Sequence, residues 1–352
     1  MQLLAEGLAR RGVEVSVISQ EEPGQPANEV VERVSVHRVF MRHVAGFRVP
    51  RGYLRELRRL DADVFHLHGN RIWCADYYFP FARSFSWPQV ITPHNFYHYW
   101  MRKGIIRWLY YERYFPGRLR AFDAYVALTE AERFQVLGWR YPSDRIQVIP
   151  NGIDLDEFRR MGVDREKTRA SWGLSAPRIA LYTGGFYDNK RVDRLVRAVA
   201  QTKGEWGLVA TGPDVPGTPY DRSACERLAK DLSAPVRFLG SQPRSTVLSA
   251  YASADAYLQG SAFEGFGVSL LEAMAVGLPF IAFDAGAAKE LASSGAGYVV
   301  SSEGEMAARL EEIVGRTEVM RRAGLASVQE YSVEKMVDRH LALYRLLARR
   351  RP

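Results

Sequence analysis

The chain has 352 residues, of which 25% are charged and 47% are hydrophobic. This composition is that of a folded globular protein, and it excludes a disordered, collagen-like or coiled-coil chain. Lys and Arg exceed Asp and Glu by 48 to 40, which gives a net charge of +8, and residues 1–150 carry most of the excess. No apolar run is long enough to span a membrane, and no export signal is visible. We expect a cytoplasmic protein of about two domains, whose first half meets an anionic partner.

Short apolar runs alternate with helical periods along the chain. In the first half, helices are expected over 2–11 and 52–60, and strands over 13–19, 63–68, 89–92, 124–128 and 146–149. In the second half, strands are expected over 179–183, 206–211, 236–239, 256–259, 279–283 and 297–300, with helices over 191–200, 220–231, 246–253, 269–276 and 303–314. Continuous apolar strands separated by helices are typical of parallel sheets covered on both faces.

The pattern predicts an α/β protein made of two doubly wound, Rossmann-like domains with a ligand cleft between them. We place the N-terminal domain at residues 1–155 and the C-terminal domain at 156–330. A C-terminal helix over 331–352 is expected to return to the first domain. Because the chain starts inside a helix, the first strand of that domain is missing. We therefore expect a gap in the first sheet, and we take Met1 to be an internal methionine of a longer natural chain.

The segment Gly260–Pro279, GSAFEGFGVSLLEAMAVGLP, holds the densest signal for chemistry. In one helix, Glu264 and Glu272 would lie about 80° apart around the axis. A helix that starts after Gly267 instead leaves Glu264 on a loop and puts Glu272 one turn in. The amides of Gly267, Val268 and Ser269 would then form a helix N-terminus suited to a phosphate.

Four blocks together resemble the retaining, nucleotide-sugar-dependent glycosyltransferases of family 4, the group 1 glycosyltransferases. They are DVFHLHG at 63–69, QVIPNGIDLDEF at 147–158, GGFYDNKRVDRL at 184–195 and the segment at 260–279. They occur in the family order and at the family spacing. The resemblance implies the two-domain GT-B fold and the transfer of a sugar from a UDP- or GDP-sugar donor.

The resemblance also implies roles for single residues. Glu272 matches the glutamate that binds the ribose hydroxyls of the donor, and Glu264 matches the one that faces the transferred sugar. Lys190 matches the lysine that neutralises the diphosphate, a task that suits a compact ammonium. The segment Phe238–Gly240 resembles the one whose backbone holds the nucleotide base.

One position departs from the family pattern. The family has an arginine five or six residues before the lysine, where this chain has Gly185 and Gly184. Arg191 is the candidate substitute for this second phosphate clamp, although it needs a different backbone path. This departure leaves two alternatives open: the protein binds the diphosphate more weakly, or it uses a different donor.

His94, just after a strand, matches the family histidine at the floor of the cleft and is the second catalytic candidate beside Glu264. A hydrogen bond from it to a sugar hydroxyl would orient the reacting groups. His66 and His68 point to one face of their strand. They are read as structural or cleft-lining residues, or as a metal pair that lacks a third ligand. Neither a metal nor another cofactor is expected.

The segment 100–120, WMRKGIIRWLYYERYFPGRLR, interleaves basic and aromatic side chains. An amphipathic helix of this composition suits an anionic membrane surface, and a core helix with a solvated arginine face is the alternative. We predict that Arg102, Lys103, Arg107 and Trp108 meet the acceptor or the membrane. Nucleic acid is not an expected partner, because nothing else in the sequence supports it.

The sequence therefore predicts a metal-independent hexosyltransferase, peripheral on the inner face of the cell membrane, with a lipid-linked or envelope glycan acceptor. A transferase with a soluble small-molecule acceptor is one alternative. A non-catalytic subunit that binds a sugar nucleotide is the other.

Overall fold

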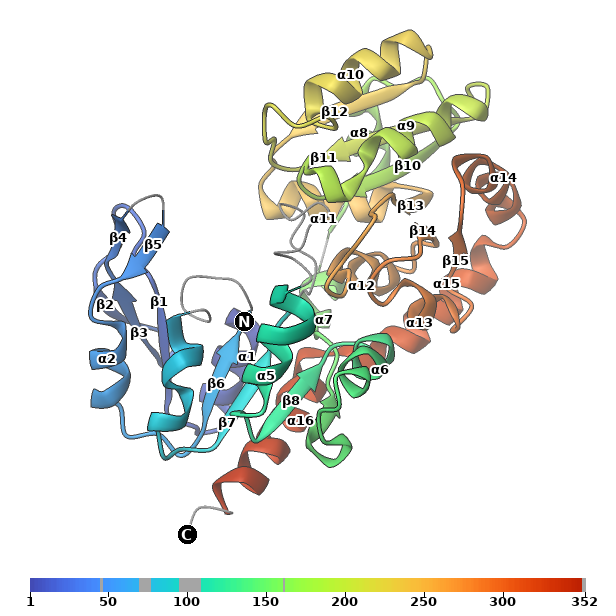
Figure 1. Cartoon of the computed structure of the whole chain (residues 1–352). Helices are drawn as coiled ribbons and strands as arrows, with labels where there is room; N and C mark the ends of the chain where they lie inside the picture. The colour runs from blue at the N-terminus through green and yellow to red at the C-terminus, as the bar shows by residue number, and fades with distance from the viewer. Residues whose placement is uncertain (45–46, 70–76, 95–108, 161, 350–352) are drawn as a thin grey trace. The chain divides into compact units, whose positions relative to one another are not determined.

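A computed structural model describes residues 1–44, 47–69, 77–94, 109–160 and 162–349 (Figure 1). The chain forms two compact units. The first unit comprises Met1–Gly152 with Val333–Pro352, and the second comprises Ile153–Ser332. These limits differ by a few residues from the boundaries expected at 155 and 330.

The main sheet of the first unit is parallel and has the order β6–β7–β8–β9. Its strands are β6 (Phe65–His68), β7 (Gln89–Thr92), β8 (Ala124–Ala127) and β9 (Ile146–Val148). A second sheet has the order β1–β3–β2, from β1 (Val15–Gln20), β2 (Asn28–Val31) and β3 (Val34–Val39). Among the described residues no strand joins β1 to β6, so the two sheets are separate.

Antiparallel pairing in the first unit was not expected from the sequence. The strand β2 runs antiparallel to β3, and β4 (Met41–Val44) and β5 (Phe47–Pro50) form a two-stranded antiparallel sheet. The residues of β2 are mostly exposed. Because a short, exposed strand lacks a continuous apolar run, a search for buried parallel strands misses it.

Helices cover both faces of the parallel sheet in the first unit. Alternate residues of β8 point to opposite faces: Ala124 and Val126 pack with α1 (Gln2–Arg10) and α16 (Val333–Ala348), whereas Tyr125 and Ala127 pack on the other side. That other side is covered by α2 (Tyr53–Arg59), α5 (Phe115–Leu119) and α6 (Glu130–Gly138). The C-terminal helix α16 is therefore part of the first unit, although it follows the second unit in sequence.

The second unit is built on one parallel sheet of six strands with the order β12–β11–β10–β13–β14–β15. The strands are β10 (Arg178–Thr183), β11 (Trp206–Thr211), β12 (Val236–Gly240), β13 (Ala256–Gln259), β14 (Phe280–Phe283) and β15 (Gly297–Val300). In chain order this is 3-2-1-4-5-6, the doubly wound order. It puts a topological switch point between β10 and β13, where ligands of such sheets bind.

The six strands of this sheet lie between two layers of helices (Figure 1). The apolar residues of α9 (Val192–Gln201), α10 (Arg222–Asp231) and α14 (Glu303–Val314) form one core with the sheet. On the other face lie α8 (Arg165–Trp172), α11 (Arg244–Ser253) and α12 (Val268–Ala275). The shorter or peripheral helices are α7 (Leu155–Arg159), α13 (Ala288–Ala292) and α15 (Thr317–Ser327).

A group of buried histidines fastens α16 to β6 in the first unit. His66 contacts the Tyr344 hydroxyl through Nδ1, and its Nε2 lies 2.8 Å from Thr92 Oγ1. His340 donates from Nδ1 to the Met336 carbonyl over 2.8 Å, and its ring centroid lies 5.7 Å from that of His66. Burial lowers the pKa of His66 and lowers the pKa of His340 to about 4. These rings are therefore neutral in the folded protein near pH 7.

This burial makes the stability of the first unit depend on pH. His340 has a lower pKa in the folded than in the unfolded chain, so its contribution is present above about pH 6.5 and is lost as the pH falls toward 4. In a His340→Gln variant the unfolding free energy should fall less between pH 7 and pH 5 than in the wild type, by up to about 2 kcal/mol. Chemical denaturation at the two pH values measures this difference.

The comparison between variant and wild type isolates His340 from other titrations. Burial raises the pKa of the Glu132 carboxyl to about 7. This raised pKa makes the protein less stable as the pH rises, opposite to the effect of His340, but it is the same in the variant and the wild type. An equal pH dependence in the two proteins would show that His340 does not have the lowered pKa.

Candidate functional site

The candidate site lies at the carboxyl ends of β10 and β13 in the second unit. Lys190 ends the short 3-10 turn Asp188–Lys190 after β10, and Glu264 lies in the loop between β13 and α12. The Lys190 Nζ atom lies 2.7 Å from Glu264 Oε1, and the Ser261 hydroxyl donates to the same oxygen over 2.6 Å. The two charged side chains are 24% and 12% exposed, so both remain accessible at the edge of the sheet.

Backbone contacts hold the same two loops together. Asn189 donates from Nδ2 to the Phe263 carbonyl over 3.2 Å, and the Ala262 N–H donates to the Asn189 carbonyl over 2.7 Å. The ion pair thus belongs to a junction with three links, which joins segments 74 residues apart in the sequence. Sequence analysis named Lys190 and Glu264 but missed Ser261 and Asn189, because one serine and one asparagine in loops carry no distinctive spacing.

The loops at this edge approach each other so closely that only glycine fits at two positions. A Cβ atom at Gly212, after β11, would lie 2.0 Å from the Gly184 carbonyl oxygen, and a Cβ at Gly260, after β13, would lie 2.5 Å from the Arg191 carbonyl oxygen. These glycines therefore let the loops after β10, β11 and β13 pack backbone against backbone.

Two tyrosine rings lie beside the positions where the family motif has its second phosphate clamp. A Cβ at Gly185 would lie 2.1 Å from the Tyr187 ring, and a Cβ at Gly184 would lie 2.7 Å from the Tyr182 hydroxyl. An arginine at either position would require these rings to move. The position without the family arginine is therefore one where tyrosine rings pack against the turn.

Arg191, the predicted substitute, has other partners. Its guanidinium donates to both carboxylate oxygens of Asp193, each over 2.8 Å, and lies 4.4 Å from the centroid of the Tyr220 ring. A contact between Arg191 and a donor phosphate would have to compete with these interactions, and it stays a prediction.

The helix α12 begins at Val268 with Gly267 as its N-cap, which confirms the helix start expected from the sequence. Gly267 has φ 98°, a conformation that favours glycine. The first amides of a helix have no partners within it, so those of Val268 and Ser269 suit an anion. Glu272 lies on the second turn of this helix.

Both carboxylate oxygens of Glu272 accept hydrogen bonds from the protein. Arg244 donates from Nη1 to Oε1 over 2.6 Å, and the Tyr251 hydroxyl donates to Oε2 over 2.8 Å. Arg244 also donates to both oxygens of Glu157, over 3.0 and 2.7 Å, and these bonds lower the pKa of the Glu157 carboxyl. The sequence did not indicate Arg244, Tyr251 or Glu157, because they lie on two other helices at unrelated spacings.

Phe238–Gly240, the predicted base-binding segment, forms the end of β12. The Phe238 ring lies 5.9 Å from the Phe186 ring, centroid to centroid, and packs against the core of the second unit. The Gly240 carbonyl accepts from Thr211 Oγ1 over 2.7 Å and the Leu239 carbonyl accepts from Gln242 Nε2 over 2.6 Å, so contact between this segment and a nucleotide base stays a prediction.

His94 belongs to the first unit and lies two residues after the end of β7. Its Nε2 atom lies 2.8 Å from Nδ1 of His68, and its φ of 61° is unusual for a residue other than glycine. Burial lowers the pKa of His94 to about 4 and also lowers the pKa of His68. Near pH 7 His94 is therefore a neutral hydrogen-bonding group and not a cation.

The predicted acceptor residues Arg102, Lys103, Arg107 and Trp108 lie outside the described residues. Just after them, residues 109–119 are helical. None of the described helices is long and apolar enough to cross a membrane. Among all the residues that the structure describes, no group of three or more His, Cys, Asp or Glu is arranged to hold a metal ion.

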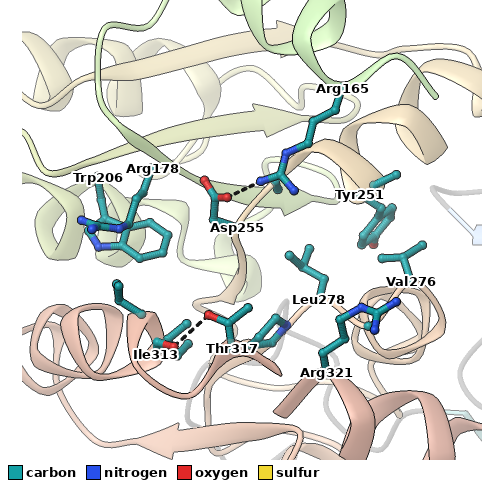
Figure 2. A pocket seen from close by; sticks show the side chains of 15 residues that line it. Arg165, Arg178, Trp206, Tyr251, Asp255, Val276, Leu278, Ile313, Thr317 and Arg321 are labelled. Atoms are coloured by element: carbon teal, nitrogen blue, oxygen red, sulfur yellow. Dashed lines mark hydrogen bonds and ion pairs between the residues drawn. The ribbon is translucent and has the colours of Figure 1, made fainter. Parts of the chain in front are cut away.

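A cavity of about 310 Å³ lies at the opposite, amino-terminal edge of the sheet in the second unit (Figure 2). Arg178 and Trp206, the first residues of β10 and β11, line it together with Arg165 and Asp255. Asp255 binds Arg165 and also accepts the backbone N–H of Ile179 over 2.8 Å. These contacts fasten α8 to the sheet, and Tyr251, whose hydroxyl binds Glu272, also lines the cavity.

Two family profiles match the chain. The profile described as Glycosyltransferase Family 4 matches residues 1–157, and the one described as Glycosyl transferases group 1 matches residues 164–326. Curated relatives described as D-inositol 3-phosphate glycosyltransferases, from Mycobacterium bovis and Mycobacterium tuberculosis, are 32% identical over 235 residues. That alignment covers 63% of this chain and 48% of the relatives, so the chain spans about half of their length.

Solved structures share the fold at low sequence identity. A sucrose-phosphate synthase from Thermosynechococcus elongatus has a TM-score of 0.79 at 20% identity, with 98% of this chain and 91% of the other covered. WaaG, a glycosyltransferase involved in lipopolysaccharide biosynthesis, has a TM-score of 0.71 at 19% identity, covering 97% and 94%. HepE from Anabaena in complex with UDP-glucose has a TM-score of 0.72 at 16% identity, covering 94% and 100%. The chain therefore belongs to the family 4, group 1 glycosyltransferases, and its two units are the Rossmann-like domains of the GT-B fold.

Proposed function

We propose that the protein is a retaining hexosyltransferase that moves a sugar from a UDP- or GDP-sugar to a hydroxyl group of an acceptor. The observation that carries the proposal is the half-buried pair of Lys190 and Glu264, 2.7 Å apart at the switch point of the second sheet. Ligands of doubly wound sheets bind at this point. Family membership and the complex of the similar HepE with UDP-glucose support a nucleotide sugar as the ligand.

In the proposed complex the donor diphosphate takes the place of Glu264 as the partner of the Lys190 ammonium. The first amides of α12 provide a second source of positive potential. Negative charge grows on the diphosphate as the sugar leaves, and a preorganised cation stabilises that charge in the transition state. Glu264, released from Lys190, then faces the transferred sugar, while Glu272 holds the ribose.

Retention of configuration is assigned to a displacement on one face of the sugar. The bond from the anomeric carbon to the diphosphate oxygen breaks as the bond to the acceptor oxygen forms on the same side. The leaving phosphate oxygen takes the acceptor proton, so the protein need not supply a nucleophile. His94, neutral near pH 7, would orient a sugar or acceptor hydroxyl by hydrogen bonding.

For the acceptor we propose a lipid-linked or envelope glycan precursor at the inner face of the cell membrane. The alternation of basic and aromatic residues over 100–120 suits an anionic membrane surface. The similar fold of WaaG, which is described as acting in lipopolysaccharide biosynthesis, agrees with this acceptor class. A soluble acceptor is the second candidate, favoured by the 32% identity to D-inositol 3-phosphate glycosyltransferases.

Lys190→Ala tests the proposed donor site. A screen of UDP- and GDP-hexoses should raise the melting temperature of the wild type, because a ligand that binds only the folded state stabilises it. With the donor that binds, nucleoside diphosphate release should fall about 100-fold or more in Lys190→Ala, since the transition-state charge loses its cation. Melting temperature without ligand should be unchanged.

The matched control is Lys230→Ala, which removes an exposed lysine from the end of α10. Full activity of Lys190→Ala would refute the assignment of the site. Stabilisation of the wild type by a nucleotide sugar with no release of diphosphate, whichever hydroxyl acceptor is added, would favour a non-catalytic binding subunit.

Flotation with vesicles tests the acceptor surface. The wild type should float with vesicles that contain phosphatidylglycerol but not with neutral phosphatidylcholine vesicles, and salt should weaken the association. Replacement of Arg102, Lys103 and Arg107 by alanine should abolish flotation. A control that removes three charges elsewhere, at Lys230, Arg321 and Arg322, should leave it intact. Absence of wild-type flotation would favour the soluble acceptor.

A further inference from the structure

We infer that Arg244 and Tyr251 are positioning residues that hold the Glu272 carboxylate in the orientation that recognises a ribose diol, and that Glu157 fixes Arg244 for this task. The inference rests on the proposed function, because it takes Glu272 as the residue that binds the donor ribose. It adds the part of the protein that makes this carboxylate specific for ribose over deoxyribose.

The hydrogen-bonding capacity of Glu272 matches a diol. Each carboxylate oxygen can accept about two hydrogen bonds. The protein supplies one donor to each: Arg244 to Oε1 over 2.6 Å and Tyr251 to Oε2 over 2.8 Å. One acceptor position is then left on each oxygen, and two vicinal hydroxyl groups are the ligand that uses one position on each. The Glu272 side chain is 14% exposed, so ligand can still reach it.

The position of the Tyr251 proton follows from its neighbours. The Tyr251 hydroxyl has one proton and two acceptors within reach, Glu272 Oε2 at 2.8 Å and the Ser269 carbonyl oxygen at 3.3 Å, so it donates toward them, with the shorter bond to Glu272. Thr183 Oγ1, 2.5 Å from the Tyr251 oxygen, must then be the donor in that contact. Tyr251 is 1% exposed and its ring stacks on that of Tyr257, with centroids 5.5 Å apart. This anchor therefore links Glu272 rigidly to the end of β10.

Arg244 is itself held on three sides. Glu157 accepts two hydrogen bonds from its guanidinium, at Nε and Nη2, and the ring centroid of Phe158 lies 5.4 Å from its Cζ atom. The planar guanidinium keeps Nη1 for Glu272 while the other nitrogens bind Glu157. Isolated ion pairs at the surface contribute little to stability. The geometry of the contact between Arg244 and Glu272 indicates that Arg244 orients the Glu272 carboxylate and adds little to stability.

Affinity for ribonucleotides and 2′-deoxyribonucleotides tests the inference. Binding of UDP is compared with that of 2′-deoxy-UDP by calorimetry, and GDP with 2′-deoxy-GDP, and the pair that binds the wild type is used. A hydrogen bond to a charged group is worth about 1.5–3 kcal/mol, so the wild type should prefer the ribonucleotide by about tenfold or more. In Arg244→Gln and in Tyr251→Phe this preference should fall to about threefold or less, with the affinity for the deoxynucleotide nearly unchanged.

Arg309→Gln is the matched control. Arg309 is also a partly exposed arginine that binds two carboxylates, Glu305 and Glu312, and it stacks on Tyr298, but it lies on α14. This variant should keep the wild-type preference. Melting temperatures without ligand show whether Arg244→Gln or Tyr251→Phe has changed stability. If the two residues had a purely structural role, the variants would bind the ribonucleotide and the deoxynucleotide more weakly by the same factor.

The outcomes separate this inference from the proposed function. If the wild type binds neither nucleotide of either pair, the proposed donor site is wrong. If the wild type prefers the ribonucleotide and Glu272→Gln loses the preference but Arg244→Gln and Tyr251→Phe keep it, only the positioning role is overturned. Tighter binding of the ribonucleotide by Arg244→Gln would also overturn it, because Arg244 would then be a competitor of the ribose.

Discussion

The ion pair between Lys190 and Glu264 is the interaction on which the site in the second unit depends. At the switch point, the connections that leave β10 and β13 go to opposite faces of the sheet, and ligands of such sheets bind there. The pair joins the two loops at this point, and the contacts of Asn189 and Ser261 hold it in place. Because both side chains are partly exposed, each charge can exchange its partner for a ligand without being left buried and unpaired.

Close packing at the carboxyl edge of the sheet limits which groups can meet a diphosphate there. The loops after the strands approach backbone to backbone, and the rings of Tyr182 and Tyr187 fill the space around Gly184 and Gly185. Arg191 is turned toward Asp193 and Tyr220. In the proposed donor complex the positive potential therefore comes from Lys190 and from the amino end of α12, and not from a lysine and an arginine together.

The two glutamates of the site have environments that differ in a way that suits their proposed tasks. Glu272 accepts from an arginine fixed by Glu157 and from a buried tyrosine, which leaves its carboxylate little freedom. Glu264 accepts from the buried Ser261 hydroxyl and from Lys190, whose ammonium stands on a flexible stem. The ribose keeps the same hydrogen bonds throughout a transfer, so a rigid acceptor suits it. The charge on the diphosphate and sugar changes during the reaction, and a mobile ammonium can follow that change.

The sequence by itself predicted the α/β class, the six strands of the second unit, five of its helices and the start of α12, because buried strands and helix-starting glycines are local signals. Family motifs also indicated Lys190, Glu264 and Glu272 as candidate site residues. The strands β2, β3, β4 and β5 were missed, since each is short and contains polar residues instead of one continuous apolar run. Tertiary structure alone decided that Lys190 pairs with Glu264 and that Glu272 accepts from Arg244 and Tyr251, with Glu157 bound to Arg244. These groups come from separate loops and helices, and no spacing in a sequence records which side chains a fold brings within hydrogen-bonding distance.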